Sequence, residues 1–92
     1  MKFIQTFAGK PESMNEVLAR FKKTGGQPPN GVKLLGRWIA ADLSMGFELL
    51  ESDDPVALSE FTLMWIDLLE LKILPVVEDP QLVEAMQRVS KK

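Results

Sequence analysis

The side chains able to do chemistry in this 92-residue chain are limited, because it contains no histidine, cysteine or tyrosine. General acid–base catalysis could therefore come only from carboxylates, lysines or groups that act through water. Cysteine nucleophiles, disulfides and imidazole- or thiolate-based metal and haem sites are excluded. We expect no cofactor and no metal.

Two charged residues are the candidates for catalysis. Glu51 stands at the end of an expected strand, and a carboxylate held beside aromatic rings could act as a base toward an acidic C–H or phenolic proton. Arg37 lies inside another expected strand and could stabilise an anion there. The structural alternative for Arg37 is an ion pair with Glu48 on the neighbouring strand. Asp67 and Glu70 are the other carboxylates expected near the same cleft.

Aromatic side chains indicate where a ligand could bind. If the second expected helix covers the strand face that carries Trp38, then Trp38 and Trp65 line one pocket between sheet and helices. Arg37 would lie at this ligand site, and the other rings expected there are Phe3, Phe7, Phe47 and Phe61. Pockets of such composition typically bind small molecules. The alternative is that aromatic residues at helical spacing simply form core.

Two acidic pairs could attract a hard cation, but both stand at expected helix starts. Asp53-Asp54 precedes Pro55, and Glu78-Asp79 precedes Pro80. An acidic residue followed by proline is typical of a helix N-cap and the first helical position. Capping by the residue before each proline therefore accounts for both pairs without a metal ion.

The elements that must position these side chains follow from apolar patterning. Strand-like runs occupy residues 2–8, 33–41, 46–52 and 70–78. Helical spacing predicts three helices, which begin near Pro11, Pro55 and Pro80, the second of them running to Leu68. The resulting βαββαβ order with a C-terminal helix predicts one α+β domain over residues 1–92. Its fold class is ferredoxin-like, with an antiparallel four-stranded sheet and helices on one face.

Both faces of the expected sheet are largely apolar. If Ala41 pairs with Gly46, one face carries Arg37, Ile39, Glu48 and Leu50, and the other carries Leu34, Gly36, Trp38, Ala40, Phe47, Leu49 and Glu51. Helices can cover only one face, and a domain of this size buries too little apolar surface to be more than marginally stable alone. We therefore expect a homodimer that forms through sheet faces.

Charge and hydropathy exclude other partners. The net charge of −2 lacks the basic excess typical of nucleic-acid binders. No apolar stretch approaches the 18 residues of a membrane span, and the N-terminal run is too short and polar for a signal peptide. We expect a cytoplasmic protein.

Two long segments resemble a known family. GGQPPNGVKLLGRWIAADLSMGFELLESDDP, residues 25–55, and WIDLLELKILPVVED, residues 65–79, are similar to the recurrent stretches of the DUF3303 family of small uncharacterised bacterial proteins. The resemblance covers nearly the whole chain. It implies a dimeric α+β barrel, in which two ferredoxin-like sheets pack face to face with the helices outside. Relatives by fold include cofactor-free antibiotic-biosynthesis monooxygenases and muconolactone isomerase-like proteins, but the resemblance brings no established activity.

Three functions remain open from the sequence. The first is a homodimeric domain that binds a small apolar or aromatic ligand in a sheet–helix cleft. The second is a cofactor-free monooxygenase- or isomerase-like enzyme with Glu51 as base and Arg37 as anion stabiliser, which the missing histidine and tyrosine disfavour. The third is a structural or regulatory interaction module.

Overall fold

The computed structural model describes residues 1–91 and has the predicted order of elements. These are β1 (Lys2–Gly9), a 3₁₀ turn η1 (Pro11–Ser13) that leads into α1 (Met14–Thr24), β2 (Lys33–Ile39), β3 (Gly46–Glu51), α2 (Pro55–Leu63), β4 (Leu69–Val76) and α3 (Asp79–Ser90). The βαββαβ fold with an appended helix is confirmed.

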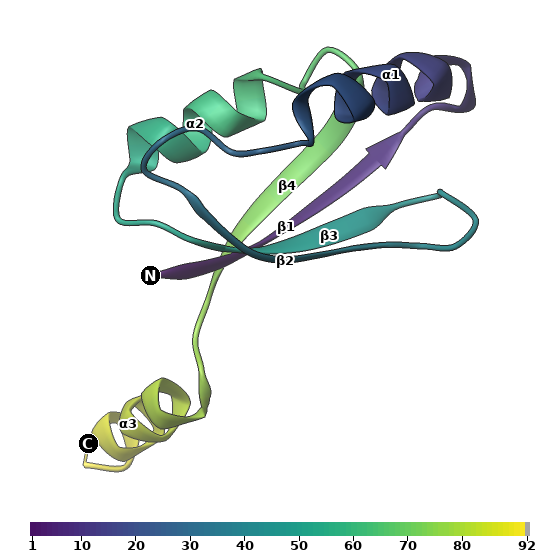
Figure 1. Ribbon diagram of the computed structural model, residues 1–92. Helices are drawn as coiled ribbons and strands as arrows, with labels where there is room; N and C mark the ends of the chain where they lie inside the picture. Colours follow the sequence, from purple (N-terminus) through teal and green to yellow (C-terminus); the bar gives the residue numbers. More distant parts are fainter. Residues whose placement is uncertain (92) are drawn as a thin grey trace.

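The four strands form one antiparallel sheet in the order β2-β3-β1-β4. Helices α1 and α2 lie over one face of this sheet, and no element within residues 1–91 covers the opposite face (Figure 1). We call the two faces the covered face and the open face. Pro75 lies on the edge strand β4, where a residue without an N–H costs the sheet least.

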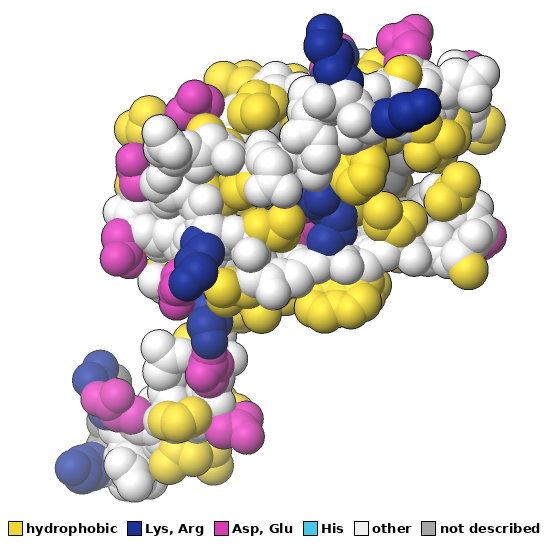
Figure 2. All heavy atoms as spheres, viewed as in Figure 1, with side chains coloured by type: hydrophobic (Ala, Val, Ile, Leu, Met, Phe, Trp, Pro, Cys, Tyr) yellow, Lys and Arg dark blue, Asp and Glu magenta, His cyan; other side chains and the backbone are white. Residues whose placement is uncertain are grey.

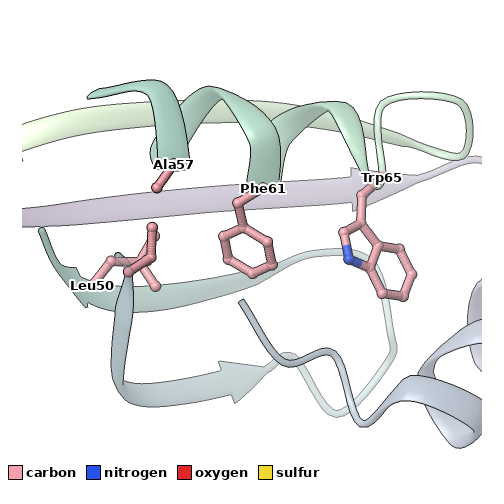
Figure 3. Close-up of a cluster of buried hydrophobic side chains, with 5 residues drawn as sticks. Leu50, Ala57, Phe61 and Trp65 are labelled. Carbon is pink, nitrogen blue, oxygen red and sulfur yellow. The ribbon is translucent and has the colours of Figure 1, made fainter. Parts of the chain in front are cut away.

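The core lies between α2 and the covered face. Leu50 of β3 points toward Ala57 and Phe61 of α2, and Trp65 lies beside them just after the helix (Figure 3). Leu50 is 0% exposed and Phe61 is 2% exposed. Burial of this cluster is what holds α2 against the sheet, since each such side chain contributes roughly 1.5–3 kcal/mol when buried.

The pairing of β2 with β3 differs from the predicted register. Ile39, rather than Ala41, pairs with Gly46, so Arg37 lies directly opposite Glu48. A bulge between Leu34 and Gly36 then places Leu34 opposite Leu50 on the covered face. The prediction for Leu34 was wrong, because one extra residue in a strand reverses the side-chain alternation beyond it.

Helix α2 is shorter than predicted. It ends at Leu63 rather than Leu68, and the hydrogen bond from the Trp65 amide goes to the Thr62 carbonyl at 3.1 Å, three residues back. This tighter spacing converts the end of the helix into turns, which direct the chain into β4.

The acidic pairs are at helix starts, as expected. Asp54 Oδ1 accepts hydrogen bonds from the amides of Val56 and Ala57 at 3.0 and 3.1 Å. For α3 the N-cap is Glu78 rather than the predicted Asp79, and the Glu78 amide donates to the Gln81 side chain at 2.8 Å. Within residues 1–91 no group of three acidic side chains is arranged to hold a metal ion.

Two apolar surfaces have no cover within the described chain. On the open face, Trp38 stacks on Phe47 with ring centroids 5.8 Å apart, and Trp38 is 53% exposed. Helix α3 projects from the body on the side away from α1 and α2 (Figure 1). Its large apolar side chains are all exposed: Leu82, Val83, Met86 and Val89. None of the helices among residues 1–91 is long and apolar enough to span a membrane.

The cap of α2 gives a direct test of this architecture. Asp54→Ala removes both side-chain hydrogen bonds to the first turn, so the free energy of unfolding should fall by about 1 kcal/mol. Urea denaturation followed by circular dichroism measures it. Asp53→Ala is the matched control, because Asp53 caps no amide of α2 and its removal breaks only an exposed ion pair with the N-terminal amine, 3.1 Å away. Equal losses for the two variants would contradict the capping assignment.

Candidate functional site

A cavity of about 170 Å³ lies between α1 and the covered face. Its walls are apolar and come from every layer of the fold, among them Phe7, Val17, Phe21, Ile39, Phe61, Trp65 and Leu71, with Leu43 and Met45 from the loop between β2 and β3. The polar side chains in the lining are Gln5, Arg37 and Glu48. Figure 2 shows basic and acidic side chains recessed between hydrophobic ones, in the region between the helices and the sheet.

The three polar side chains form one cluster across three strands. Glu48 on β3 is only 3% exposed, and its cross-strand neighbours are Gln5 on β1 and Arg37 on β2. Gln5 Nε2 donates to Glu48 Oε1 at 2.9 Å, and Arg37 Nε donates to Glu48 Oε2 at 2.6 Å. Each carboxylate oxygen therefore has a donor, which a buried charge requires.

Arg37 also fixes the wall of the cavity. Its terminal nitrogens donate to the carbonyls of Gly25, at 3.2 Å, and of Gly26, and its guanidinium lies 5.3 Å from the centroid of the Phe21 ring. Gly26 adopts φ +62°, and a Cβ there would lie 2.9 Å from the Arg37 nitrogens, so only glycine permits this approach. The predicted Arg37–Glu48 ion pair is present, and it ties the end of α1 to the sheet.

The side-chain oxygen of Gln5 is the exception in this hydrogen-bonded cluster. Its Oε1 is the buried side-chain polar atom of residues 1–91 that has no hydrogen-bond partner. Gln5 was not singled out from the sequence, although the signal exists: it alternates with Phe3 and Phe7 and so places an amide on an otherwise apolar face. A buried polar group without a partner is rare enough to require an explanation.

The structure brings together only some of the predicted ligand-site residues. Arg37, Phe61 and Trp65 line the cavity, but Trp38 and Phe47 do not. The expectation that both tryptophans share a pocket is wrong, because the helices cover the face of Arg37 and Glu48 and leave the face of Trp38 open. Phe7 lines the cavity as expected, whereas Phe3 packs against the core beside it.

The predicted carboxylates lie outside the cavity. Glu51 and Glu70 pair across the sheet with Lys2 and Ala8, which places both on the open face. Arg37 is on the covered face, so Glu51 and Arg37 do not share one site. Sequence alternation placed Glu51 on the face of Trp38, but it could not say which face the helices would cover.

Asp67 has a structural partner rather than a place in the cavity. Arg20 on α1 donates to both Asp67 oxygens at 2.8 Å and to the Met64 carbonyl at 3.0 Å. The guanidinium lies 5.4 Å from the Trp65 ring centroid. This fork joins α1 to the turn after α2 and thereby holds two walls of the cavity together. The hydrogen bonds from Arg20 lower the pKa of Asp67, and the pairing raises the pKa of Arg20.

Comparison with known proteins adds a family and a fold. The family described as "Domain of unknown function (DUF3303)" matches residues 1–90. A solved structure of Rv0793 from Mycobacterium tuberculosis is similar with a TM-score of 0.52 at 15% identity, over 85% of this chain and 95% of that one. A candidate antibiotic biosynthesis monooxygenase from Deinococcus radiodurans aligns with a TM-score of 0.42 at 12% identity, over 85% of this chain and 94% of that one. The sequence matches none of the curated proteins with which it was compared.

The Arg20–Asp67 fork predicts a pH dependence. Because folding lowers the pKa of Asp67, its stabilising effect is present above the unfolded-state pKa of about 4 and is lost as pH falls through the lower folded-state value. Asp67→Asn should therefore lower Tm at pH 7, and its Tm should converge with that of the wild type under acid conditions. Thermal melts between pH 2 and pH 7, roughly bracketing that range, measure this.

Arg20→Gln is the matched variant, because it removes the same pair from the other side. In its background, Asp67→Asn should change Tm little at any pH. A Tm difference between wild type and Asp67→Asn that stays constant from neutral to acid pH would contradict the assignment.

Proposed function

The chain belongs to the DUF3303 family, whose function is unknown, and from its own geometry we propose that it is a homodimeric domain that binds one small apolar or aromatic molecule in the cavity between α1 and the sheet. The observation that carries this proposal is the cavity itself, an apolar hollow open to solvent on one side, with a few convergent polar groups. That combination is the usual character of small-molecule sites.

The size of the cavity favours a ligand with a single ring. Its volume of about 170 Å³ is similar to that of an engineered apolar cavity of about 150 Å³ that binds benzene. The walls supply aromatic contacts from Phe7, Phe61 and Trp65. A neutral, flat molecule would replace the missing contacts of these side chains.

Binding is favoured over catalysis by the state of the two charges in the cavity. Arg37 and Glu48 neutralise one another and both are hydrogen-bonded, so the cavity offers no uncompensated charge to a reacting group. The separation of Glu51 from Arg37 removes the pair on which the enzyme hypothesis rested.

The homodimer proposal rests on the two uncovered apolar surfaces. Trp38, Phe47 and Leu74 expose large apolar side chains on the open face, and an isolated 12-residue helix such as α3 is marginal in water. Both surfaces lie on the side of the sheet away from α1 and α2 (Figure 1). A second copy packed against the open face would therefore also meet α3, and one contact would cover both surfaces.

Filling the cavity tests the binding proposal. Val17→Phe adds a ring to a half-buried position in the lining, so the affinity for toluene and p-cresol should fall about tenfold or more. Titration calorimetry measures the affinities. Asn15→Phe is the control, because it adds the same ring to an exposed position of α1 outside the lining. Absence of binding to the wild type at millimolar probe would contradict the proposal and favour an interaction module.

Charge on the open face tests the dimer. Trp38→Asp and Leu74→Asp each place a carboxylate in the proposed interface and should weaken dimerisation about 100-fold. Sedimentation velocity across a micromolar range measures it, with circular dichroism as the check on folding. Leu63→Asp is the control, since Leu63 is exposed on α2. A wild type that is monomeric throughout this range would contradict the dimer.

A further inference from the structure

The unpartnered oxygen of Gln5 carries information about the ligand. Gln5 is 2% exposed, it lines the cavity, and its Oε1 has no hydrogen-bond partner. Leaving a buried acceptor unpaired costs free energy, and the cost disappears when a donor arrives. Oε1 itself is buried even with the cavity empty, so an occupant supplies this donor when the Gln5 amide rotates slightly toward the cavity that the residue lines.

The orientation of the amide is fixed by its neighbour. An ionised carboxylate can only accept hydrogen bonds, so the contact of 2.9 Å to Glu48 Oε1 requires the amide nitrogen of Gln5 on that side. Arg37 donates to the other oxygen of Glu48 at 2.6 Å and holds the carboxylate in place. Flipping the amide would set two oxygens against each other, and therefore Oε1, rather than Nε2, is the atom that needs a partner.

We propose that the molecule bound in this cavity is neutral and carries a hydroxyl or N–H group, which donates a hydrogen bond to Gln5 Oε1. This inference rests on the proposed binding function and specifies the chemical class of the ligand. Gln5 would then determine specificity: among apolar molecules of similar size, those with a hydrogen-bond donor would bind more tightly than those without one.

The other polar groups of the cavity disfavour a charged ligand. Arg37 already donates to Glu48 and to the carbonyls of Gly25 and Gly26, so a carboxylate or phosphate would meet no uncompensated cation. Arg37 already neutralises the Glu48 carboxylate, so an ammonium group would meet no uncompensated anion. A net-neutral cluster in which one acceptor has no partner matches a neutral ligand that carries a donor.

Water is a poor substitute for that donor. A stable buried water usually makes about three hydrogen bonds. Beside Gln5, the other polar side chains of the lining are Arg37 and Glu48, which are already paired, and the remaining side chains are apolar. A ligand that satisfies Oε1 with its hydroxyl and fills the apolar walls with its ring meets both requirements at once.

Four single-ring probes separate the alternatives on the wild-type protein. They are p-cresol, a neutral donor; 4-methylanisole, which has the same ring and oxygen without a donor; toluene; and the anion p-toluate. We expect p-cresol to bind about fivefold or more tighter than 4-methylanisole, although the methyl ether is the more apolar molecule. Titration calorimetry gives the affinities, and the side-chain amide resonance of Gln5 should shift with p-cresol but not with toluene.

Gln5→Leu removes the acceptor and should abolish the preference for p-cresol, while toluene still binds. Thr6→Val is the matched control, because Thr6 is the next residue of β1 and lies on the open face. If Gln5→Leu does not fold, the wild-type ratio and the Gln5 resonance decide the question.

Three results would overturn the inference. Equal binding of p-cresol and 4-methylanisole to the wild type removes the donor requirement but leaves the proposed binding function intact. Tighter binding of p-toluate than of p-cresol would show that the cavity prefers an anionic ligand to a neutral one. Binding of none of the four probes removes the proposed function together with the inference.

Discussion

The buried carboxylate of Glu48 is the constraint on which much of this structure depends. A charge at 3% exposure is tolerable only if donors reach both of its oxygens. Gln5 and Arg37 supply them from the two flanking strands, so pairing of β1, β3 and β2 in any other register would leave the charge unpaired. Arg37 extends the constraint to the Gly25-Gly26 turn and thus to the end of α1.

The same cluster explains why a cavity remains between α1 and the sheet. Side chains from α2 pack closely on Leu50, whereas the polar cluster lies in the lining that α1 shares with the sheet. An apolar side chain packed over the cluster would leave Gln5 Oε1 buried without a partner. Arg37 ties the end of α1 to the sheet, and the Arg20–Asp67 fork ties α1 to the turn after α2. The cavity is thus supported by charge pairs, and its lining side chains are apolar except for Gln5, Arg37 and Glu48.

The order of elements, the N-cap of α2 at Asp54 and the Arg37–Glu48 pair could be predicted from the sequence, because each depends on local pattern or on cross-strand alternation. The choice of covered face could not, since both faces are apolar and alternation alone does not distinguish them. Because the helices cover the other face, the observed site lacks the predicted residues Trp38 and Phe47 and contains Gln5, which was not predicted. The bulge at Leu34 and the early end of α2 were also beyond local pattern, because both result from how the chain must turn to reach its neighbours.

A crystal structure of the protein with p-cresol tests the central claim most directly. The account predicts the ring inside the cavity between α1 and the sheet, with its hydroxyl oxygen about 2.7–3.0 Å from Gln5 Oε1. It further predicts that the Gln5–Glu48–Arg37 contacts are unchanged. A ring bound elsewhere, or one bound in the cavity with its hydroxyl turned away from Gln5 and toward Arg37, would contradict it.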